Sequence, residues 1–369
     1  MLVAFRADAS DHIGTGHVMR CLTLADALTQ QKHRCMFICR KHQSHLGDLI
    51  TSKGYELIVL PAPDATEVKS SEGWANTYAD WLGVPWQQDA KETVEVLAPK
   101  KADWLVVDHY ALDAHWEQQV NTVVGRIMVI DDLADRQHEC VLLLDQNLGR
   151  VSSDYDEFVP KDCLRLVGPE YALLRPEFAQ LRELSLKRRE QPELKRILIS
   201  LGGVDRTNAT GQVLDALAET ALSCETQVDI VMGASAPYLA EVRQQAARLP
   251  FVATVNVNVR DMAERMHLAD LSIGAAGGTS WERCCLGLPA VLVILADNQV
   301  SGAKAQEVAG VAVAIPDPKA VQAALPLALD RLSNPDCLQR MSRAAAEITD
   351  GKGASILIDS MIAVGRKTP

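Results

Sequence analysis

Short apolar runs with high β-propensity alternate with segments of helical periodicity along the chain, and the alternation starts afresh near residue 196. In the first half the runs predict strands at 2–8, 34–39, 56–60, 103–108, 126–130 and 141–144. In the second half they predict strands at 196–203, 227–233, 251–256, 268–278, 289–296 and 311–315. Strands that alternate with helices are typical of βαβ units and a parallel sheet. The sequence therefore predicts an α/β protein with two such domains.

A charged segment of helical pattern, with Pro176 and Pro192, separates the two halves. We therefore expect an N-terminal domain at 1–167, a linker region at 168–195 and a C-terminal domain at 196–369. The length of 369 residues suits two domains of ordinary size. Ligands of open α/β sheets bind beyond the carboxyl ends of the strands, so we expect the site in a cleft between the domains.

Composition excludes several classes of partner. The net charge of -11 argues against a general affinity for nucleic acid or for anionic membrane. The chain has no apolar run of transmembrane length, and its start, MLVAFRADAS, lacks the pattern of a signal peptide. The nine cysteines include no CxxC pair, which favours free thiols in a reducing cytoplasm. No spacing typical of metal ligands is present, and the sequence leaves the oligomeric state open.

The stretch IGTGHVMR, residues 13–20, joins the first predicted strand to a helix predicted at 17–30. Gly14 and Gly16 let the backbone turn sharply and approach a ligand closely. His17 then lies in the first turn of the helix, where the positive end of the helix dipole disfavours the imidazolium form. A neutral imidazole can accept a proton as a general base. On this stretch alone, His17 is equally well explained as a polar residue near a helix end with no catalytic role.

Carboxylates follow three of the predicted strands in the first half. Asp108 and His109 end one strand, Asp131 and Asp132 follow the next, and Asp145 ends the third. The carboxyl ends of parallel strands converge, so we expect these groups to gather near His17, where one would orient the imidazole. Taken singly, each is also explained by a helix cap or a loop hydrogen bond.

The strongest local signal of the second half is IGAAGGTSWERCCLGLP, residues 273–289. A strand ends in glycines and a helix opens at Thr279, an arrangement whose backbone N–H groups suit a pyrophosphate. Glu282 lies three residues further on and could accept hydrogen bonds from ribose hydroxyls. Thr279 and Glu282 also fit a capping box, in which both would serve the helix end alone.

A second glycine turn, SLGGVDRTN at 200–208, also lies between a strand and a helix. We expect Gly202 and Gly203 to line the same cleft as the turn at 274–279. Neither turn has the pattern GxGxxG or GxxxxGK[ST], which disfavours a nicotinamide dehydrogenase and a P-loop ATPase.

A set of motifs runs in order through roughly residues 1–330: RADAS, IGTGHVMRC, VVDHY, IDD, LLLDQN, GPEYALLRPEF, LISLGG, GGTSWE and ADNQ. Together they closely resemble the UDP-2,4-diacetamido-2,4,6-trideoxy-β-L-altropyranose hydrolases of pseudaminic acid biosynthesis, a family related to GT-B glycosyltransferases. The resemblance implies two Rossmann-like domains in a GT-B-type arrangement with an inter-domain cleft. It also implies inverting attack of water at the anomeric carbon of a UDP-sugar, with release of UDP and without a cofactor or metal.

The resemblance implies roles for individual residues. His17 corresponds to the general base, and Glu282 to the ribose ligand. The diphosphate loop corresponds to Gly277, Gly278, Thr279 and Ser280. The sugar end of the cleft corresponds to Asn298 and Gln299, with Gly14 and Gly16 admitting the sugar, and the uracil is expected near 259–262. Further expected contacts to sugar or phosphate are Arg6, Asp8, Asp108, Tyr171 and Arg175.

Three other functions remain open on the sequence. A GT-B glycosyltransferase would use the same donor site and add an acceptor pocket. A nucleotide-sugar 2-epimerase would need an acid/base set around the second carbon of the sugar. A nucleotide-sugar-binding protein without catalysis would need no base in the glycine loop.

Overall fold

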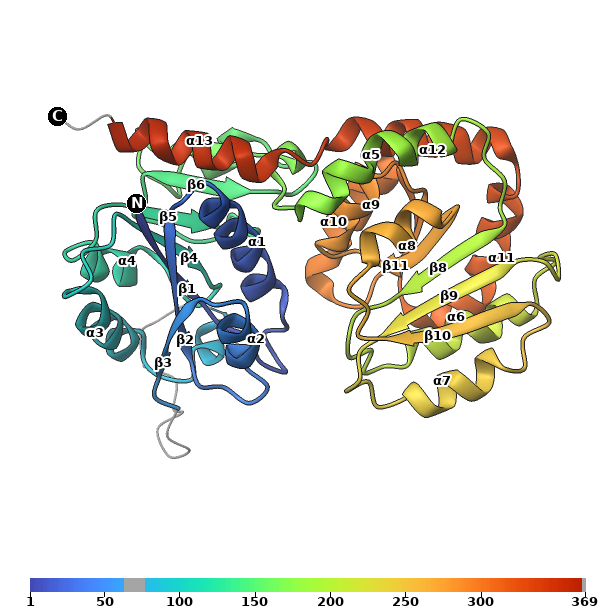
Figure 1. Cartoon of the computed structure of the whole chain (residues 1–369), viewed down its shortest axis with the longest axis horizontal. Helices are drawn as coiled ribbons and strands as arrows, with labels where there is room; N and C mark the ends of the chain where they lie inside the picture. Colours follow the sequence, from blue (N-terminus) through green and yellow to red (C-terminus); the bar gives the residue numbers. More distant parts are fainter. Residues whose placement is uncertain (63–76, 367–369) are drawn as a thin grey trace. The chain divides into compact units, whose positions relative to one another are not determined.

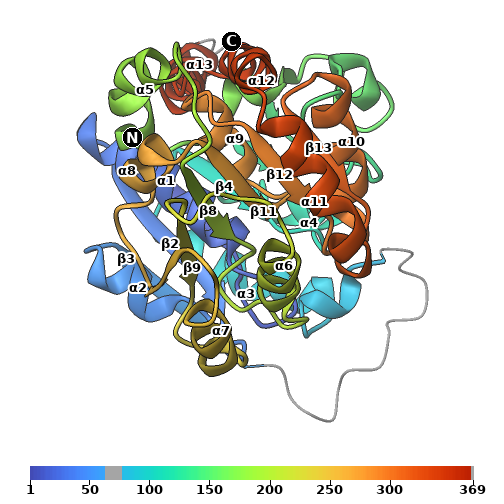
Figure 2. The ribbon, with the colours of Figure 1, turned by 90° about the vertical axis from the view of Figure 1, so that its right-hand side faces the viewer.

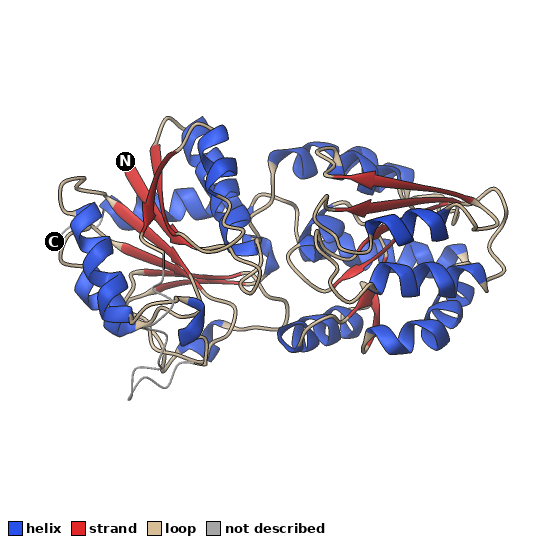
Figure 3. Ribbon diagram, turned by 90° about the horizontal axis from the view of Figure 1, so that it is seen from below, coloured by secondary structure: helices blue, strands red, loops and turns tan. Residues whose placement is uncertain are grey.

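The computed structural model describes residues 1–62 and 77–366 and divides the chain into two compact units (Figure 1). The first unit contains residues 1–173 and the C-terminal residues from 353 onward, and the second contains residues 174–352. In each unit helices flank the strands of a parallel sheet (Figure 3). The predicted α/β class with two Rossmann-like units is therefore confirmed.

The sheet of the first unit has the strand order β3-β2-β1-β4-β5-β6-β7, and its neighbouring strands pair in parallel. Its strands are β1 Leu2–Ala7, β2 Arg34–Arg40, β3 Glu56–Leu60, β4 Trp104–Asp108, β5 Ile127–Ile130, β6 Leu142–Asp145 and β7 Leu164–Val167. The helices are α1 Gly16–Gln30, α2 Gly47–Ser52, α3 Trp86–Leu97, α4 Ala114–Val120 and α13 Gly353–Arg366, with short 3-10 helices η1 Ala79–Trp81, η2 Ser152–Tyr155 and η3 Pro169–Tyr171.

Side chains alternate between the two faces of this sheet, as the period of a strand requires. Val3 and Phe5 of β1 belong to the core that also contains apolar residues of α1 and α13. Ala4 of the same strand belongs to the opposite core, with apolar residues of α3 and α4. Both faces of the sheet are therefore buried, which explains why its strands read as nearly continuous apolar runs.

The sheet of the second unit has the strand order β10-β9-β8-β11-β12-β13, again with parallel pairs. Its strands are β8 Arg196–Ser200, β9 Gln227–Met232, β10 Val252–Val257, β11 Leu271–Ala275, β12 Ala290–Val293 and β13 Ala312–Ile315. The helices are α5 Pro176–Arg188, α6 Ala209–Ala218, α7 Leu239–Ala246, α8 Met262–Leu268, α9 Thr279–Cys285, α10 Val300–Val308, α11 Val321–Leu332 and α12 Pro335–Ile348, with η4 Asp297–Gln299 and η5 Pro318–Ala320.

Apolar residues of α6, α7 and α11 pack with β8, β9 and β11 in the core of the second unit (Figure 2). Helix α5 packs against α8 and α9, and α12 packs against α9. None of the helices in residues 1–62 and 77–366 has the length and apolarity needed to cross a bilayer.

The predicted domain bounds are revised. The C-terminal domain was expected at 196–369, but its last helix, α13, belongs to the first unit. Leu357, Ile358 and Met361 of α13 are buried in the core of that unit. The expected linker at 168–195 divides, with η3 in the first unit and α5 in the second. The boundary lies at residues 173 and 174, and the N-terminal domain therefore extends past residue 167.

Each sheet contains one point where the strand order reverses. In the first unit β1 lies beside β4, and in the second unit β8 lies beside β11. Connections leave such neighbours in opposite directions, and the crevice beyond their carboxyl ends is the usual ligand site of an open α/β sheet. The loop before His17 follows β1, and the two glycine turns of the second unit follow β8 and β11.

Candidate active site

The glycine loop of the first unit joins β1 to α1. Gly14 has a φ of 79°, a left-handed conformation that favours glycine, and its N–H donates to the carbonyl oxygen of Ser10 at 2.8 Å. A Cβ atom at Gly14 or Gly16 would meet no heavy atom within 4 Å. Helix α1 begins at Gly16 without a side-chain cap. The loop therefore leaves open space beside His17, the second residue of the helix.

His17 is held by the carboxylate of Asp108 at the end of β4. Its Nδ1 lies 2.5 Å from Oδ1 of Asp108, and the side chains of the two residues are 8% and 0% exposed. Burial disfavours ionisation of Asp108 most strongly, but Arg20 and His17 together outweigh it and hold the pKa of this carboxyl below its usual range. An ionised carboxylate accepts the Nδ1–H, so the Nε2 atom of a neutral His17 keeps its lone pair.

Arg20 connects Asp108 to a second carboxylate. Its Nε and Nη2 atoms lie 2.6 Å from the two carboxylate oxygens of Asp108, and its Nη1 lies 2.7 Å from Oδ2 of Asp132. Arg20 follows His17 by three residues and therefore shares its face of α1. Arg20 was not among the predicted site residues, although its spacing from His17 in HVMR places both on one face of a helix.

Aromatic side chains pack beside the imidazole. The ring of Tyr110 meets that of His17 edge-on, with centroids 4.7 Å apart, and its hydroxyl donates to Oδ2 of Asp132 at 2.8 Å. The rings of Tyr78 and Trp81 lie 5.3 and 5.6 Å from that of Tyr110. Tyr110 was not predicted as a site residue, although it follows Asp108 closely in the motif VVDHY.

Arg6 and Asp8 were predicted to contact sugar or phosphate, and the structure gives them a different role. Both are fully buried, and they pair with each other at 2.7 Å. Arg6 also pairs with Asp89 of α3 at 2.7 Å, while Asp8 lies 3.4 Å from Nε2 of His109. They form part of a buried charge network on the α3 side of the sheet. Asp108, predicted as a substrate contact, is likewise buried and orients His17 instead.

The other strand-end carboxylates join His17 only in part. Asp132 is connected through Arg20, whereas Asp131 and Asp145 share the hydroxyl of Tyr155 at 3.0 and 2.9 Å. Burial, with repulsion from Asp132 and Asp131, raises the pKa of Asp145 to about 7. The expected gathering of all these groups at His17 is therefore limited to Asp108 and Asp132.

In the second unit, the turn between β11 and α9 presents Gly277, Gly278 and Thr279. A Cβ atom at either glycine would meet nothing within 4 Å, so packing does not demand glycine there. Gly278 is the N-cap residue, and no side chain caps α9. The capping box considered for Thr279 and Glu282 is therefore absent.

Glu282 instead faces Arg175. Its Oε1 lies 3.5 Å from Nη2 of Arg175, which also pairs with Glu177 at 2.9 Å. Burial raises the pKa of Glu282, and Arg175 opposes the rise. The structure thus brings two predicted residues, Arg175 and Glu282, together. The carboxylate of Glu282 does not cap its own helix.

Ser280, predicted to contact the diphosphate, lies on the inner side of the turn. It is 1% exposed, and its hydroxyl accepts a hydrogen bond from Nη2 of Arg283 at 2.9 Å. The same Nη2 atom donates to the carbonyl oxygen of Ala275 at 2.8 Å. Ser280 therefore supports the turn from within rather than facing its open side.

The second glycine turn follows β8, the neighbour of β11. Gly202 has a φ of 101°, and a Cβ atom at Gly202 or Gly203 would meet nothing within 4 Å. Asp205 accepts hydrogen bonds from the N–H groups of Ala209 and Thr210, which anchors the turn to α6. Both glycine turns of this unit thus lie at its strand-order reversal.

The remaining predicted residues lie in loops. Asn298 is exposed, while the Oε1 atom of Gln299 accepts from the N–H of Leu295 at 3.0 Å and so stabilises its own loop. Tyr171 is half-buried in η3 of the first unit. The segment 259–262, expected beside the uracil, follows β10 and leads into α8.

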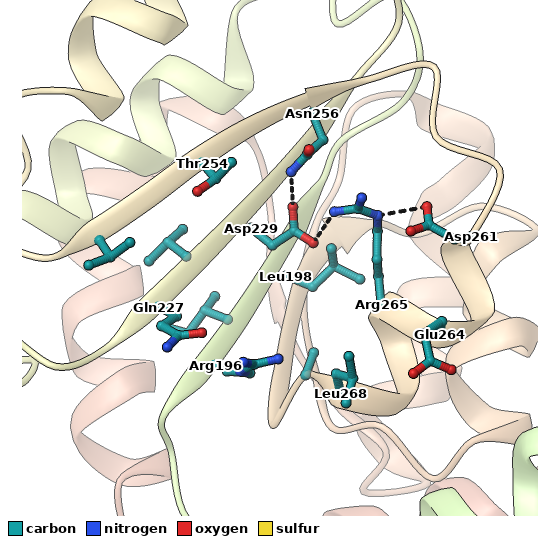
Figure 4. A pocket seen from close by; sticks show the side chains of 14 residues that line it. Arg196, Leu198, Gln227, Asp229, Thr254, Asn256, Asp261, Glu264, Arg265 and Leu268 are labelled. Atoms are coloured by element: carbon teal, nitrogen blue, oxygen red, sulfur yellow. Dashed lines mark hydrogen bonds and ion pairs between the residues drawn. The ribbon is translucent and has the colours of Figure 1, made fainter.

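A cavity of about 330 Å³ lies elsewhere, on the face of β8, β9 and β10 beside α8 (Figure 4). Within it, Arg265 pairs with Asp229 at 2.6 Å and with Asp261 at 2.9 Å. Of the predicted positions it contains only Asp261, from the segment 259–262. The cavity lies away from the glycine turns, and we assign it no role.

Comparisons with known proteins agree with this architecture. A family model, the glycosyltransferase family 28 C-terminal domain, matches residues 199–355. The chain is 28% identical over 273 residues to the UDP-2,4-diacetamido-2,4,6-trideoxy-β-L-altropyranose hydrolase of Campylobacter jejuni, covering 73% of this chain and 81% of that protein. The Acinetobacter baumannii MurG structure matches with a TM-score of 0.69 and 16% identity, covering 98% of this chain and 99% of that one. The chain has the GT-B fold.

A second GT-B neighbour carries a nucleotide. The S. aureus MnaA-UDP co-structure matches with a TM-score of 0.62 and 11% identity, covering 98% of this chain and 96% of that one. The resemblance inferred from the motifs is confirmed, since the hydrolase is among the relatives. In the described residues of this GT-B protein, His, Cys, Asp and Glu side chains form no group of three fit to hold a metal ion.

Proposed function

We propose that this GT-B protein hydrolyses UDP-2,4-diacetamido-2,4,6-trideoxy-β-L-altropyranose to UDP and the free diacetamido sugar, in pseudaminic acid biosynthesis. Water attacks the anomeric carbon with inversion. The observation that carries the proposal is the pair of His17 and Asp108, whose Nδ1 and Oδ1 atoms lie 2.5 Å apart beside an open glycine loop. The hydrolase relative supports the choice of substrate. All nine cysteines are free, in keeping with a reaction in the cytoplasm.

The proposed step balances with His17 as general base. Nε2 of His17 takes a proton from water, the water oxygen forms a bond to the anomeric carbon, and the bond from that carbon to the diphosphate oxygen breaks. The electron pair of the broken bond leaves with UDP. Asp108 stabilises the imidazolium that forms, as a carboxylate does in related base–carboxylate pairs. Inversion requires the water to lie opposite the leaving group.

The second unit supplies the contacts to the leaving group in this proposal. Backbone N–H groups of Gly277, Gly278 and Thr279 stabilise the charge that develops on the diphosphate. Glu282 accepts hydrogen bonds from the ribose hydroxyls, and the turn at Gly202 and Gly203 lies against the nucleotide. UDP is a good leaving group, so the reaction needs little acid assistance. No metal or cofactor takes part in the proposed step.

The test separates catalysis from binding. Replacing His17 with alanine (His17→Ala) is expected to abolish release of UDP from the sugar while leaving the affinity for UDP nearly unchanged. Isothermal titration calorimetry and a coupled assay for UDP measure the two quantities on the same preparation. Loss of UDP binding with an intact fold, or retention of turnover, would contradict the role of His17.

A GT-B glycosyltransferase is the second candidate, because the family 28 domain and the fold are those of transferases. It would use the same donor contacts and place an acceptor hydroxyl where the hydrolase places water. The two candidates differ in whether UDP is released when no acceptor is present. Release at an unchanged rate with and without added acceptor sugars favours hydrolysis.

A further inference from the structure

Arg283 lies on α9, four residues after the turn that we propose for the diphosphate. It is 2% exposed. Its Nη2 atom donates to the carbonyl oxygen of Ala275, before the turn, and to the hydroxyl of Ser280, after it, at 2.8 and 2.9 Å. One guanidinium therefore fixes both ends of the segment that contains Gly277 and Gly278.

Within the part of the chain that the structure describes, no carboxylate forms a close ion pair with Arg283, and Glu282 offsets its charge only from a longer distance. Its recorded hydrogen bonds go to neutral oxygens, and its buried Nε has no hydrogen-bond partner. Burial lowers the pKa of Arg283 to about 10, so the guanidinium still carries its charge at neutral pH. A buried cation without a close counter-ion destabilises a protein, and a bound anion relieves that cost. This arrangement suits a turn that receives an anionic ligand.

Strand β11, which precedes the turn, has a glycine at the position that contacts Arg283. A Cβ atom on Gly274 would come within 2.5 Å of Nη1 of Arg283 and within 3.1 Å of the carbonyl oxygen of Ser200. The glycine of β11 is thus explained by the guanidinium that lies across it. Arg283 lies against the end of β11, under the turn, rather than on the surface of α9.

We propose that Arg283 is a positioning residue for the diphosphate of the UDP-sugar, which fixes the turn and supplies the buried positive charge that favours the diphosphate there. The proposal rests on the proposed diphosphate site at Gly277, Gly278 and Thr279. Arg283 acts in two ways: its two hydrogen bonds hold the turn, and its charge adds to the field of the backbone N–H groups. The second effect grows with the negative charge of the ligand.

The experiment measures affinities for UDP, UMP and uridine by calorimetry in the wild type and in two variants. Arg283→Gln keeps a hydrogen-bond donor and removes the charge. Arg283→Lys keeps the charge and replaces the planar guanidinium by an ammonium group. We expect Arg283→Gln to weaken UDP binding at least tenfold, UMP binding less and uridine binding under twofold. Arg283→Lys should recover most of the preference for UDP over uridine. Ser280→Ala, which removes one contact to the turn, should weaken UDP binding a few-fold and leave uridine unchanged.

The relative losses of affinity for UDP, UMP and uridine distinguish a positioning role of Arg283 from a purely structural one. Equal losses for all three ligands in Arg283→Gln would overturn the proposal in favour of a purely structural role, and an unchanged preference for UDP would overturn it as well. If Arg283→Gln fails to fold, Arg283→Lys and Ser280→Ala decide by the same comparison of UDP with uridine. A wild-type protein that binds UDP no better than uridine would instead contradict the proposed diphosphate site itself.

Discussion

The Nδ1 atom of His17 lies 2.5 Å from Oδ1 of Asp108, and both oxygens of that carboxylate also contact Arg20. A histidine from the start of α1 is thereby tied to the end of the neighbouring strand β4. The pair determines which imidazole nitrogen is free, because the carboxylate accepts from Nδ1 and leaves the lone pair on Nε2, the atom that acts as base in the proposed function. The central chemical claim of the proposed function depends on this relationship.

Replacing Asp108 with asparagine (Asp108→Asn) tests the relationship directly. The amide can donate to Nδ1, which favours the tautomer with hydrogen on Nε2 and blocks the base. We expect kcat to fall by roughly 10²–10⁴-fold with little change in KM, as when the carboxylate of a comparable base pair is replaced. Steady-state assays of UDP release give both constants. Asp113→Asn, which keeps a good helix cap on α4, is the matched control and should retain full activity.

The ion pairs of Arg20 make a prediction about stability. Arg20→Met leaves Asp108 and the partly buried Asp132 without their shared cation, and breaking a buried pair costs about 3–5 kcal/mol. Arg20→Lys should lie between Arg20→Met and the wild type. Lys53→Met, which removes a surface pair with Asp26, should cost about 1 kcal/mol or less. Urea unfolding followed by circular dichroism compares the variants, and equal effects at the two sites would contradict the assignment.

Asp145 gives the protein a pH-dependent stability. Its pKa of about 7 in the folded state is above its usual value of 3.8, because hydrogen bonds from the N–H of Asn147 and the hydroxyl of Tyr155 only partly offset burial and the neighbouring carboxylates. Unfolding therefore releases a proton between about pH 4 and pH 7, and the contribution of Asp145 to stability falls as pH rises through that window.

Asp145→Asn should remove this dependence. A neutral amide can donate to the oxygen of Tyr155, as a protonated Asp145 would, while the hydroxyl of Tyr155 donates to Asp131. We expect the melting temperature of the variant to equal that of the wild type below pH 4 and to exceed it above pH 7. Thermal unfolding across pH 4–8 measures the difference, and a variant that is less stable at pH 8 would contradict the prediction.

Glu282 is predicted to recognise the ribose. Glu282→Ala should weaken binding of UDP by about 1.5–3 kcal/mol, the range of a hydrogen bond to a charged group, which corresponds to roughly 10–150-fold. Binding of 2′,3′-dideoxy-UDP, which lacks the ribose hydroxyls, should change little. Calorimetric affinities for the two nucleotides test this, and an equal loss for both would assign Glu282 a structural role through Arg175 instead.

The sequence predicted the fold well because both sheets are parallel and buried. Each predicted strand is present, since continuous apolar runs between turn residues are what such strands require. Strand β7 was missed because Arg165, which pairs with Asp156, interrupts its short apolar run. The position of α13 was also unpredictable, because its packing on the first unit joins segments far apart in the chain.

The site was predicted at the level of loops and less well at the level of side chains. The glycine turns and His17 do lie at junctions of strand and helix, as their residue types indicate, and their roles in binding and catalysis stay predictions. The roles of Arg6 and Asp8 were not predicted, because their partners Asp89 and His109 lie far along the chain and meet them only in the fold. Arg283 gave no local signal, since its importance comes from contacts to Ala275 and Ser280 that exist only in the folded turn.

The most direct measurement follows the anomeric proton by NMR while the purified protein acts on UDP-2,4-diacetamido-2,4,6-trideoxy-β-L-altropyranose in the presence of EDTA and without an acceptor. The account predicts release of UDP, with the free sugar appearing first as the inverted α anomer before mutarotation, and no release by His17→Ala. Initial formation of the β anomer would contradict a single inverting attack by water. Absence of release until an acceptor sugar is added would replace the hydrolase with a GT-B glycosyltransferase.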